Sequence, residues 1–417
     1  MKILIARARV LPLLAAVLAT ALAGSTGDAD DGAVESADDN LEARRAFFDG
    51  WTPANIPAGA DVRTVVVARG PDGAPRVENG NGTLYAGVDT SRDPSAAPLY
   101  RSTDSGRTWQ PLRVFDDLSG TALVAADVVA VAPTNPKVVY AGSQRLFVGG
   151  GGTTPGLLYR SEDGGASWRE VAGGRGDLDV APIGPRAEDH LVGIDLEGVH
   201  RSVDGGRTWQ LLPGTAQAGA VEHLGTGVAF ARGVDDRRVM YASYHAGSPA
   251  GRMVIRRSQD DGVSWQTIQT GSFGELVVHP ADANHVYVSE SGGGFFSSAD
   301  GGRTLNPHND GLERVRRDGY YGLTNVAIDT VSTPPHREDA TLYIASRGDE
   351  RGGVPGEVFR WDGASRWESF ATAPEGRFIS RLEAVNVKDV PGLIALTYTI
   401  DATGIHRRLY RASLVLR

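Results

Sequence analysis

Short apolar runs of Val, Ala, Leu and Tyr recur along the chain, and residues typical of turns separate them. One set reads LYAG (84–87), VVYAG (138–142), VMYAS (239–243), HVYVS (285–289) and LYIAS (342–346). A second set precedes it, with VVAVAP (128–133), LDVAP (178–182), LVVHP (276–280) and NVAID (325–329). Such runs bounded by Pro, Asp and Gly predict β-strands. Because no segment beyond the N-terminus keeps a helical period, we predict an all-β chain.

A nine-residue motif follows these runs at fixed places. RSTDSGRTW, RSEDGGASW, RSVDGGRTW and RSQDDGVSW end at Trp109, Trp168, Trp209 and Trp265, and SSADGGRTL ends at Leu305. A degenerate copy, RWDGASRW, keeps Asp362 and Trp367 but has Ala364 where the others have glycine. The copies start 40 to 62 residues apart. Repeats of this length, each with four short strands, predict the blades of a β-propeller.

The motif itself reads as a structural turn. Its aspartate would accept hydrogen bonds from nearby backbone N–H groups, its glycine would take a positive φ, and its tryptophan would pack between neighbouring sheets. A calcium loop is the alternative, but calcium needs six or more oxygens and each copy offers one carboxylate. The positions assigned to the turn are Ser102, Asp104, Gly106, Trp109, Ser161, Asp163, Gly165, Trp168, Ser202, Asp204, Gly206, Trp209, Ser258, Asp260, Gly262, Trp265, Ser298, Asp300, Gly302, Asp362 and Trp367.

Seven such units can be counted, and the last is incomplete. It consists of RLEAVNV (381–387), LIALTYT (393–399) and RRLYRASLVLR (407–417), so it lacks a fourth strand. The segment FFDGWTPANIP can supply that strand, and its Trp51 is the tryptophan left over for a blade without a motif. We therefore predict a seven-bladed β-propeller of four-stranded antiparallel blades, closed by an N-terminal strand in the last blade.

These repeated motifs resemble those of the BNR or Asp-box β-propellers. That group includes sialidases, xyloglucanases, sortilin-like receptor domains and photosystem II assembly factors, and the resemblance covers about residues 47–417. It implies that the motif turns lie on the face away from the ligand. Two departures matter: Asn55 in PANIPAG stands where sialidases carry a carboxylate-binding arginine, and xyloglucanases place their cleft between two propellers, whereas this chain has room for one.

The N-terminus and the composition suggest an exported protein. Residues 1–23 have a basic start, an apolar stretch and an ALA site, as expected of a signal peptide, and residues 24–46 form an acidic linker without large apolar groups. The net charge of −9 would become −12 after cleavage, which argues against nucleic-acid binding and against membrane association. The chain has no cysteine for a lipid anchor, a disulfide or a thiolate metal site. We expect a secreted or periplasmic monomer without metal or cofactor, and with no membrane insertion.

Candidate chemistry lies in the loops between blades. The segment HNDGLERVRRDGYYGLTN (308–325) is the richest in charged and aromatic side chains. Because arginines match carboxylates and sulfates, the ligand-binding candidates are Arg314, Arg316, Arg317, Asp318, Arg347, Arg377 and Arg381. Neighbouring loops add Glu375, Asp349, Glu350, Arg351, Tyr244, His245, Glu222 and His223.

Two functions fit these residues. The first is a binding or assembly module for an extracellular or envelope protein or polysaccharide. The alternative is a glycoside hydrolase, sialidase-like or xyloglucanase-like, or a polysaccharide lyase, acting on an anionic glycan. In a sialidase-like mechanism a tyrosine beside a glutamate serves as nucleophile, which makes Tyr320, Tyr321 and Glu290 the catalytic candidates.

Overall fold

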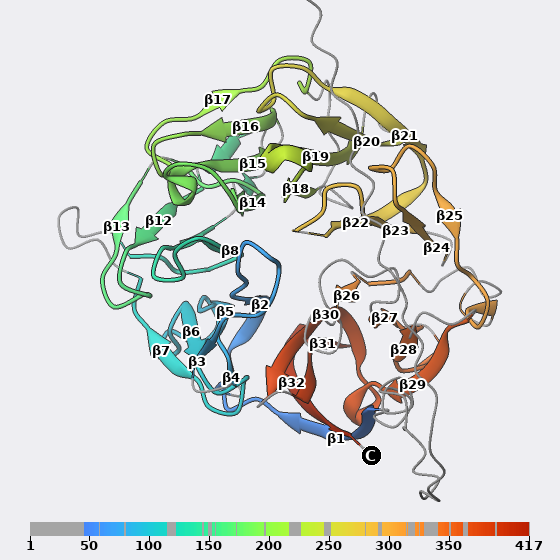
Figure 1. The fold of residues 1–417 in the computed structure, drawn as a ribbon. Coiled ribbons are helices and arrows are strands. Elements are labelled where there is room, and N and C mark those ends of the chain that lie inside the picture. The colour runs from blue at the N-terminus through green and yellow to red at the C-terminus, as the bar shows by residue number, and fades with distance from the viewer. Residues whose placement is uncertain are drawn as a thin grey trace, which may run out of the picture. The chain divides into compact units, whose positions relative to one another are not determined.

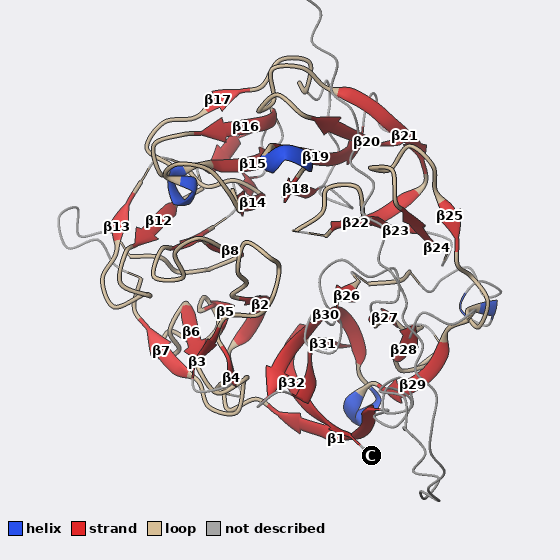
Figure 2. Ribbon diagram, in the orientation of Figure 1, coloured by secondary structure: helices blue, strands red, loops and turns tan. Residues whose placement is uncertain are grey.

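Seven antiparallel sheets surround a common axis in the computed structural model (Figure 1). They belong to the unit Arg45–Arg417. The structure describes residues 46–417 apart from 58, 79–80, 115–121, 144–145, 149–151, 155, 172, 196, 217–226, 246–251, 280, 291–293, 314, 316–321, 325, 329–340, 350–351, 362–365, 388–389 and 417. Strands dominate the described elements, and the helices are short turns (Figure 2). The fold is therefore the predicted seven-bladed β-propeller.

Each of the first six blades has four main strands that pair in chain order, with a short hairpin inserted between two of them in blades 1 and 2. Blade 1 contains β2 (Asp61–Val67), β5 (Leu84–Asp89), β6 (Leu99–Ser102) and β7 (Gln110–Leu112). Blade 2 contains β8 (Val128–Val131), β9 (Val139–Gly142), β12 (Leu158–Ser161) and β13 (Arg169–Glu170). Blade 3 contains β14 (Asp177–Val180), β15 (Leu191–Asp195), β16 (Gly198–Ser202) and β17 (Gln210–Leu211).

Blades 4 to 6 repeat this order. Blade 4 contains β18 (Gly227–Arg232), β19 (Arg238–His245), β20 (Met253–Ser258) and β21 (Gln266–Gly271). Blade 5 contains β22 (Phe273–Val278), β23 (Val286–Glu290), β24 (Phe295–Ser298) and β25 (Asn306–Pro307). Blade 6 contains β26 (Ala327–Ile328), β27 (Leu342–Ser346), β28 (Glu357–Trp361) and β29 (Glu368–Thr372).

A few short elements lie outside this plan. β3 (Val77–Glu78) and β4 (Asn81–Gly82) form a hairpin that extends the sheet of blade 7, and β10 (Leu146–Val148) pairs with β11 (Gly152–Thr154) within blade 2. Single 3-10 turns occur at η1 (Ala187–Asp189), η2 (Val234–Asp236) and η3 (Pro374–Gly376). In the part of the chain that the structure describes, no helix has the length and apolar character needed to cross a membrane.

The two ends of the described chain meet in blade 7. This blade contains β30 (Phe378–Val387), β31 (Val390–Asp401), β32 (Gly404–Leu416) and β1 (Ala46–Pro53), and β1 pairs antiparallel with β32 from Ala46↔Leu416 to Pro53↔Tyr410. The indole of Trp51 donates a hydrogen bond to the carbonyl of Thr372 in blade 6, at 2.8 Å. The predicted closure by an N-terminal strand is confirmed, and its tryptophan joins blades 7 and 6.

The motif turns share one hydrogen-bond pattern in the five copies that the structure describes in full. The serine hydroxyl donates to the aspartate at 2.8–2.9 Å, and the glycine N–H donates to that hydroxyl at 2.8–2.9 Å. The N–H of the later Thr or Ser donates to the aspartate. The glycines have φ between 81° and 99°. The predicted turn chemistry is confirmed in these copies, while Asp362 lies outside the described residues.

Packing between blades explains why the motif ends in a large apolar residue. Trp109 of blade 1 lies in one core cluster with Ile394 and Leu409 of blade 7. Trp168 of blade 2 packs with Tyr85 and Leu99 of blade 1. A tryptophan buried in this way removes a large apolar area from water at the junction. Each motif therefore joins its own blade to the preceding one.

Candidate functional site

The face opposite the motif turns carries the starts of the inner strands. In each blade the motif connects the third and fourth strands, so the antiparallel order places the start of the first strand at the other face. The inner strands β14, β22 and β30 surround the axis (Figure 1). Asp177 is the first residue of β14, Glu275 the third of β22 and Arg381 the fourth of β30. Charged side chains from three separate blades therefore meet near the axis, toward this face.

We call Asp177, Glu275, Arg381 and Glu383 the axial cluster. Nε of Arg381 donates to Oε1 of Glu383 at 3.0 Å, and Oε2 of Glu383 lies 3.5 Å from Nη2 of Arg69. The side chain of Arg381 is 40% exposed, whereas that of Glu383 is 11% exposed. The guanidinium is therefore open to solvent on one side and fixed by a buried carboxylate on the other.

Burial and charge shift the pKa values within this cluster. Burial raises the pKa of Glu275 and outweighs the lowering effect of Arg381 and Arg347. Burial likewise raises the pKa of Asp177, against the hydrogen bond from Val228 and the charge of Arg381. Burial would lower the pKa of Arg381, but Glu383 and Glu275 outweigh it, so this pKa is raised. The cluster thus holds a permanent cation beside two carboxyl groups, those of Asp177 and Glu275, whose pKa values are raised.

Two aspartates of blade 3 also serve the edge of blade 4. Oδ2 of Asp177 accepts the N–H of Val228 at 2.9 Å, and Oδ2 of Asp179 accepts the N–H of Phe230 at 2.7 Å. Inner strands leave such N–H groups unpaired by the sheet, and each needs an acceptor. Burial raises the pKa of Asp179 to about 7, although its backbone hydrogen bonds oppose the shift. These side chains connect two blades beside the axis.

Three predicted ligand groups can be placed. Arg381 is part of the axial cluster, and Arg347, which follows β27, is exposed and acts on the charge of Glu275. Arg377 is 6% exposed and donates to Oγ1 of Thr397 at 2.8 Å and to the carbonyl of His406 at 2.6 Å. The contacts of Arg377 lie within blade 7 and favour a structural role over ligand binding.

The other described candidates have contacts of their own, although Glu290 ends the strand that pairs with β22 and follows Ser289, which accepts the N–H of Glu275. Glu290 ends β23, where its N–H donates to the carbonyl of Gly294 at 2.7 Å. Tyr244 is buried, with the guanidinium of Arg256 stacked 5.9 Å from its ring centre. Glu375 accepts the hydroxyl of Tyr410 at 2.7 Å. The contacts of Glu290, Tyr244 and Glu375 are thus with residues of blades 5, 4 and 7.

The candidate residues of the richest predicted loop fall outside the described residues, although 308–313, 315 and 322–324 of that loop are described. These candidates are Arg314, Arg316, Arg317, Asp318, Tyr320 and Tyr321, and Glu222, His223, Glu350 and Arg351 of the neighbouring loops also lie outside the described residues. Only the backbone of His245 is described, and Asp349 lies beside the gap at 350–351. The pairing of a tyrosine with Glu290 stays a prediction.

Sequence reasoning missed Asp177, Asp179, Glu275 and Glu383, although a signal for them was present. Each interrupts an apolar inner-strand run, in GDLDV, GELVV and RLEAV. A carboxylate inside a strand that lines the axis must be solvated or paired there. The apolar runs predict strands, and the acidic residues within them also indicate a polar site at the axis.

Among the described residues, one group with metal-ligand chemistry occurs at the turn between β15 and β16. Asp195, Glu197 and His200 bring one ligand atom each within 4.8 Å of one another. Oδ1 of Asp195 lies 3.0 Å from Nε2 of His200, and its Oδ2 lies 3.6 Å from Nε of Arg175. The Asp195 carboxylate is thus already engaged by His200 and Arg175, and the Arg175 guanidinium would repel a cation there.

Comparison with known sequences gives one partial match. No family model matches the chain. A xyloglucanase from Paenibacillus sp. is 27% identical in an alignment of 164 residues, which covers 31% of this chain and 15% of that protein. The chain therefore spans only a small part of this relative's length.

Comparison with solved structures shows the fold. The GH74 enzyme of Niastella koreensis superposes with a TM-score of 0.57 at 16% identity, over 86% of this chain and 55% of that one. The structure of YCF48 bound to D1 peptide superposes with a TM-score of 0.51 at 12% identity, over 88% of this chain and 97% of that one. The chain thus has the β-propeller fold that both a glycoside hydrolase and a peptide-binding protein use.

Proposed function

We propose that the chain is a glycan-binding β-propeller whose ligand docks on the face opposite the motif turns, over the axial cluster. The observation that carries this is the cluster itself, in which a 40% exposed Arg381 stands among carboxyl groups from three blades. The partial sequence match to a xyloglucanase supports a carbohydrate ligand. The repeated turns support membership of the Asp-box propellers, in which the ligand face lies away from the motif.

The chemistry of the cluster suits a hydroxyl-rich ligand. A guanidinium offers several fixed donors, and a carboxylate offers acceptors for hydroxyl groups. Burial around Glu275 reduces competition from water, which strengthens each hydrogen bond. Sugar hydroxyls can act as donors and acceptors at once, so one ring could bridge Arg381 and Glu275. A few convergent polar groups on a rigid frame are typical of ligand sites.

A second candidate function, glycoside hydrolysis, has one observation in its favour. Glycosidases need one protonated carboxyl group and one ionised carboxylate on either side of the bond that breaks. Burial raises the pKa of Glu275, while Glu383 is held by Arg381 and Arg69. Glu275 would then be the proton donor. The predicted nucleophiles Tyr320 and Tyr321 remain part of this alternative.

The test measures binding and cleavage together. The full chain would be titrated with soluble neutral and acidic polysaccharides, xyloglucan among them, in affinity electrophoresis and calorimetry, with assays for reducing sugar and unsaturated uronate. We expect Arg381→Gln and Glu275→Gln to weaken binding about tenfold or more, since each removes a charged hydrogen-bonding group.

Arg207→Gln is the matched control, because Arg207 is an exposed arginine on the motif face. It should bind as the parent does. Sugar release that Glu275→Gln abolishes would establish the hydrolase. Absence of binding to every polysaccharide, or binding that neither axial variant changes, would refute the glycan site. Thermal unfolding of each variant shows whether it has folded.

A further inference from the structure

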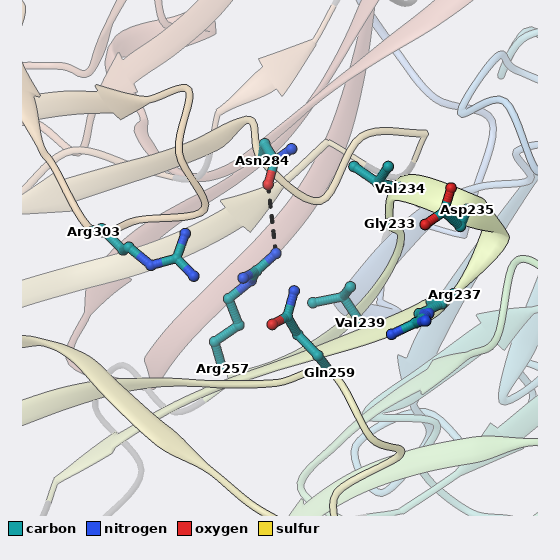
Figure 3. A pocket seen from close by; sticks show the side chains of 9 residues that line it. All are labelled: Gly233, Val234, Asp235, Arg237, Val239, Arg257, Gln259, Asn284 and Arg303. Carbon is teal, nitrogen blue, oxygen red and sulfur yellow. Dashed lines mark hydrogen bonds between the residues drawn. The ribbon is translucent and has the colours of Figure 1, made fainter. Parts of the chain in front are cut away.

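A pocket on the motif face, between blades 4 and 5, has a composition that the proposed glycan site does not explain. Its volume is about 250 Å³ (Figure 3). It is lined by the turn between β18 and β19, by the motif residues Gln259 and Arg303, by Arg257 on β20 and by Asn284. Three arginines and a single aspartate, Asp235, therefore surround it.

Arg257 is the central group of this pocket. It is 5% exposed, and its Nη2 donates to Oδ1 of Asn284 at a long 3.4 Å. The amide of Gln259, with its oxygen turned toward the guanidinium, accepts from both terminal nitrogens at 3.1 and 3.2 Å. Nε has no hydrogen-bond partner, and no carboxylate of the described residues forms an ion pair with this side chain. The hydrogen-bond partners of this buried guanidinium, Asn284 and Gln259, are thus neutral amides.

The corresponding junction of blades 2 and 3 shows one way in which this place can be filled. Arg160 precedes a motif serine as Arg257 does, is 7% exposed, and lies over Tyr140 as Arg257 lies over Tyr241, at 5.9 and 5.8 Å. Nη2 of Arg160 forms an ion pair with Oδ1 of Asp189 at 2.8 Å. One junction therefore neutralises its buried arginine from within the protein.

Asn284 occupies the place of Asp189 in the other junction. The carbonyl of Asp189 accepts the N–H of Gly205, and the carbonyl of Asn284 accepts the N–H of Gly301, at 3.0 and 2.9 Å. Both residues stand two positions before the second strand of their blade. The exchange of a carboxylate oxygen for an amide nitrogen removes the negative charge that Arg257 would otherwise meet.

Two further arginines increase the positive charge. Arg303 and Arg237 are exposed. Arg303 extends toward Arg257, and Arg237 lies on the other side of the pocket, beyond Val239 and Gln259 (Figure 3). A buried, unneutralised guanidinium is costly, and an anion that accepts its hydrogen bonds would offset that cost. Asp282, two residues before Asn284, lies 2.7 Å from Nδ1 of His285. All three arginines line this one cavity, so an anion in it would be surrounded by positive charge.

We propose that this pocket binds an oxyanion, the sulfate or phosphate group of a ligand, through Arg257, Arg303 and Arg237. The site lies on the motif face and stands independently of the glycan site. At the junction of blades 2 and 3 the carboxylate of Asp189 supplies the negative charge. At the junction of blades 4 and 5 Asn284 supplies none, so a bound anion can take that role.

The experiment titrates the full chain with inorganic phosphate and, separately, sulfate at constant ionic strength, with chloride as the reference salt. Calorimetry gives the Kd, and thermal unfolding gives the shift in Tm. The parent should bind both oxyanions at one site and unfold at a higher temperature with them than in chloride. Asn284→Asp should abolish that response and raise Tm in chloride, because the new carboxylate neutralises Arg257.

Arg303→Gln should raise the Kd about tenfold. Arg207→Gln is the matched control, because Arg207 occupies the same motif position in blade 3, and it should leave the Kd unchanged. Phosphate binding without sulfate binding would restrict the ligand to phosphate esters. An Asn284→Asp variant that responds to both anions as the parent does would overturn the proposal, and so would equal effects of Arg303→Gln and Arg207→Gln.

Discussion

A single aspartate in each motif turn organises the residues around it. Asp204 accepts the hydroxyls of Ser202 and Thr208 at 2.9 and 2.7 Å and the N–H of Thr208 at 2.9 Å. Burial would raise its pKa, but these hydrogen bonds outweigh burial and lower it. The pKa values of Asp163 and Asp300 fall to about 2 in the same way. The ionised form of each carboxylate is thus a structural element.

Acid should therefore weaken the propeller through these turns. The folded pKa values lie below the unfolded value near 4, so their contribution is present above pH 4 and is lost as pH falls toward 2. Asp204→Ala should lower the free energy of unfolding at pH 7 by about 1–2 kcal/mol. The difference in this free energy between variant and parent should be smaller at pH 2.5. Urea unfolding of both proteins at the two pH values measures the difference, with Arg207→Gln as control. Equal stability of Asp204→Ala and the parent at pH 7 would contradict this role.

At the scale of strands, Asp179 connects β14 to β18, and its contribution to the free energy of unfolding depends on pH. Its folded pKa of about 7 lies above the unfolded value, so folding favours its protonated form. The stability that this side chain contributes is fully present below pH 4 and decreases as pH rises to 7. An amide carries no charge and keeps one acceptor for the N–H of Phe230.

Asp179→Asn should thus gain stability relative to the parent as pH rises. We expect the difference in the free energy of unfolding between variant and parent to shift by about 2–3 kcal/mol in the variant's favour from pH 5 to pH 8, because a pKa of about 7 spans about two of these pH units. Urea unfolding at the two pH values gives this shift. The exposed Asp310→Asn controls for the loss of one negative charge. A shift of the opposite sign would show that the ionised form of Asp179 holds the two strands together.

Strands and motifs could be predicted from the sequence because their signals are local. A run such as VVYAG and a motif such as RSVDGGRTW each fix their own backbone through apolar spacing and turn chemistry. The axial cluster could not be predicted in the same way. Glu275 and Arg381 are over a hundred residues apart in the sequence, and only the angular order of the blades brings them together. The pKa of Glu275 depends on burial that the sequence alone does not specify.

At the scale of the whole molecule, the ring depends on one non-covalent closure. β32 would expose an unpaired edge without β1, because the other neighbour of β32 is β31. Phe48 and Trp51 contact each other with ring centres 5.3 Å apart, and Phe48 contacts Phe370 of blade 6 at 6.1 Å. The first strand therefore secures both the last blade and its junction with the blade before.

Removal of this strand should open the ring. We expect deletion of residues 44–52 to lower the Tm of the whole propeller and to broaden its transition, because each blade is stabilised by its two neighbours. Deletion of residues 24–43, predicted to be a linker, should leave the Tm unchanged and is the matched control. Trp51→Ala keeps the strand and removes only the indole, so it should lower the free energy of unfolding by about 2 kcal/mol. Scanning calorimetry of the three variants measures these effects. Equal Tm values for the two deletions would mean that blade 7 is stable with three strands, and that blade packing rather than strand pairing closes the ring.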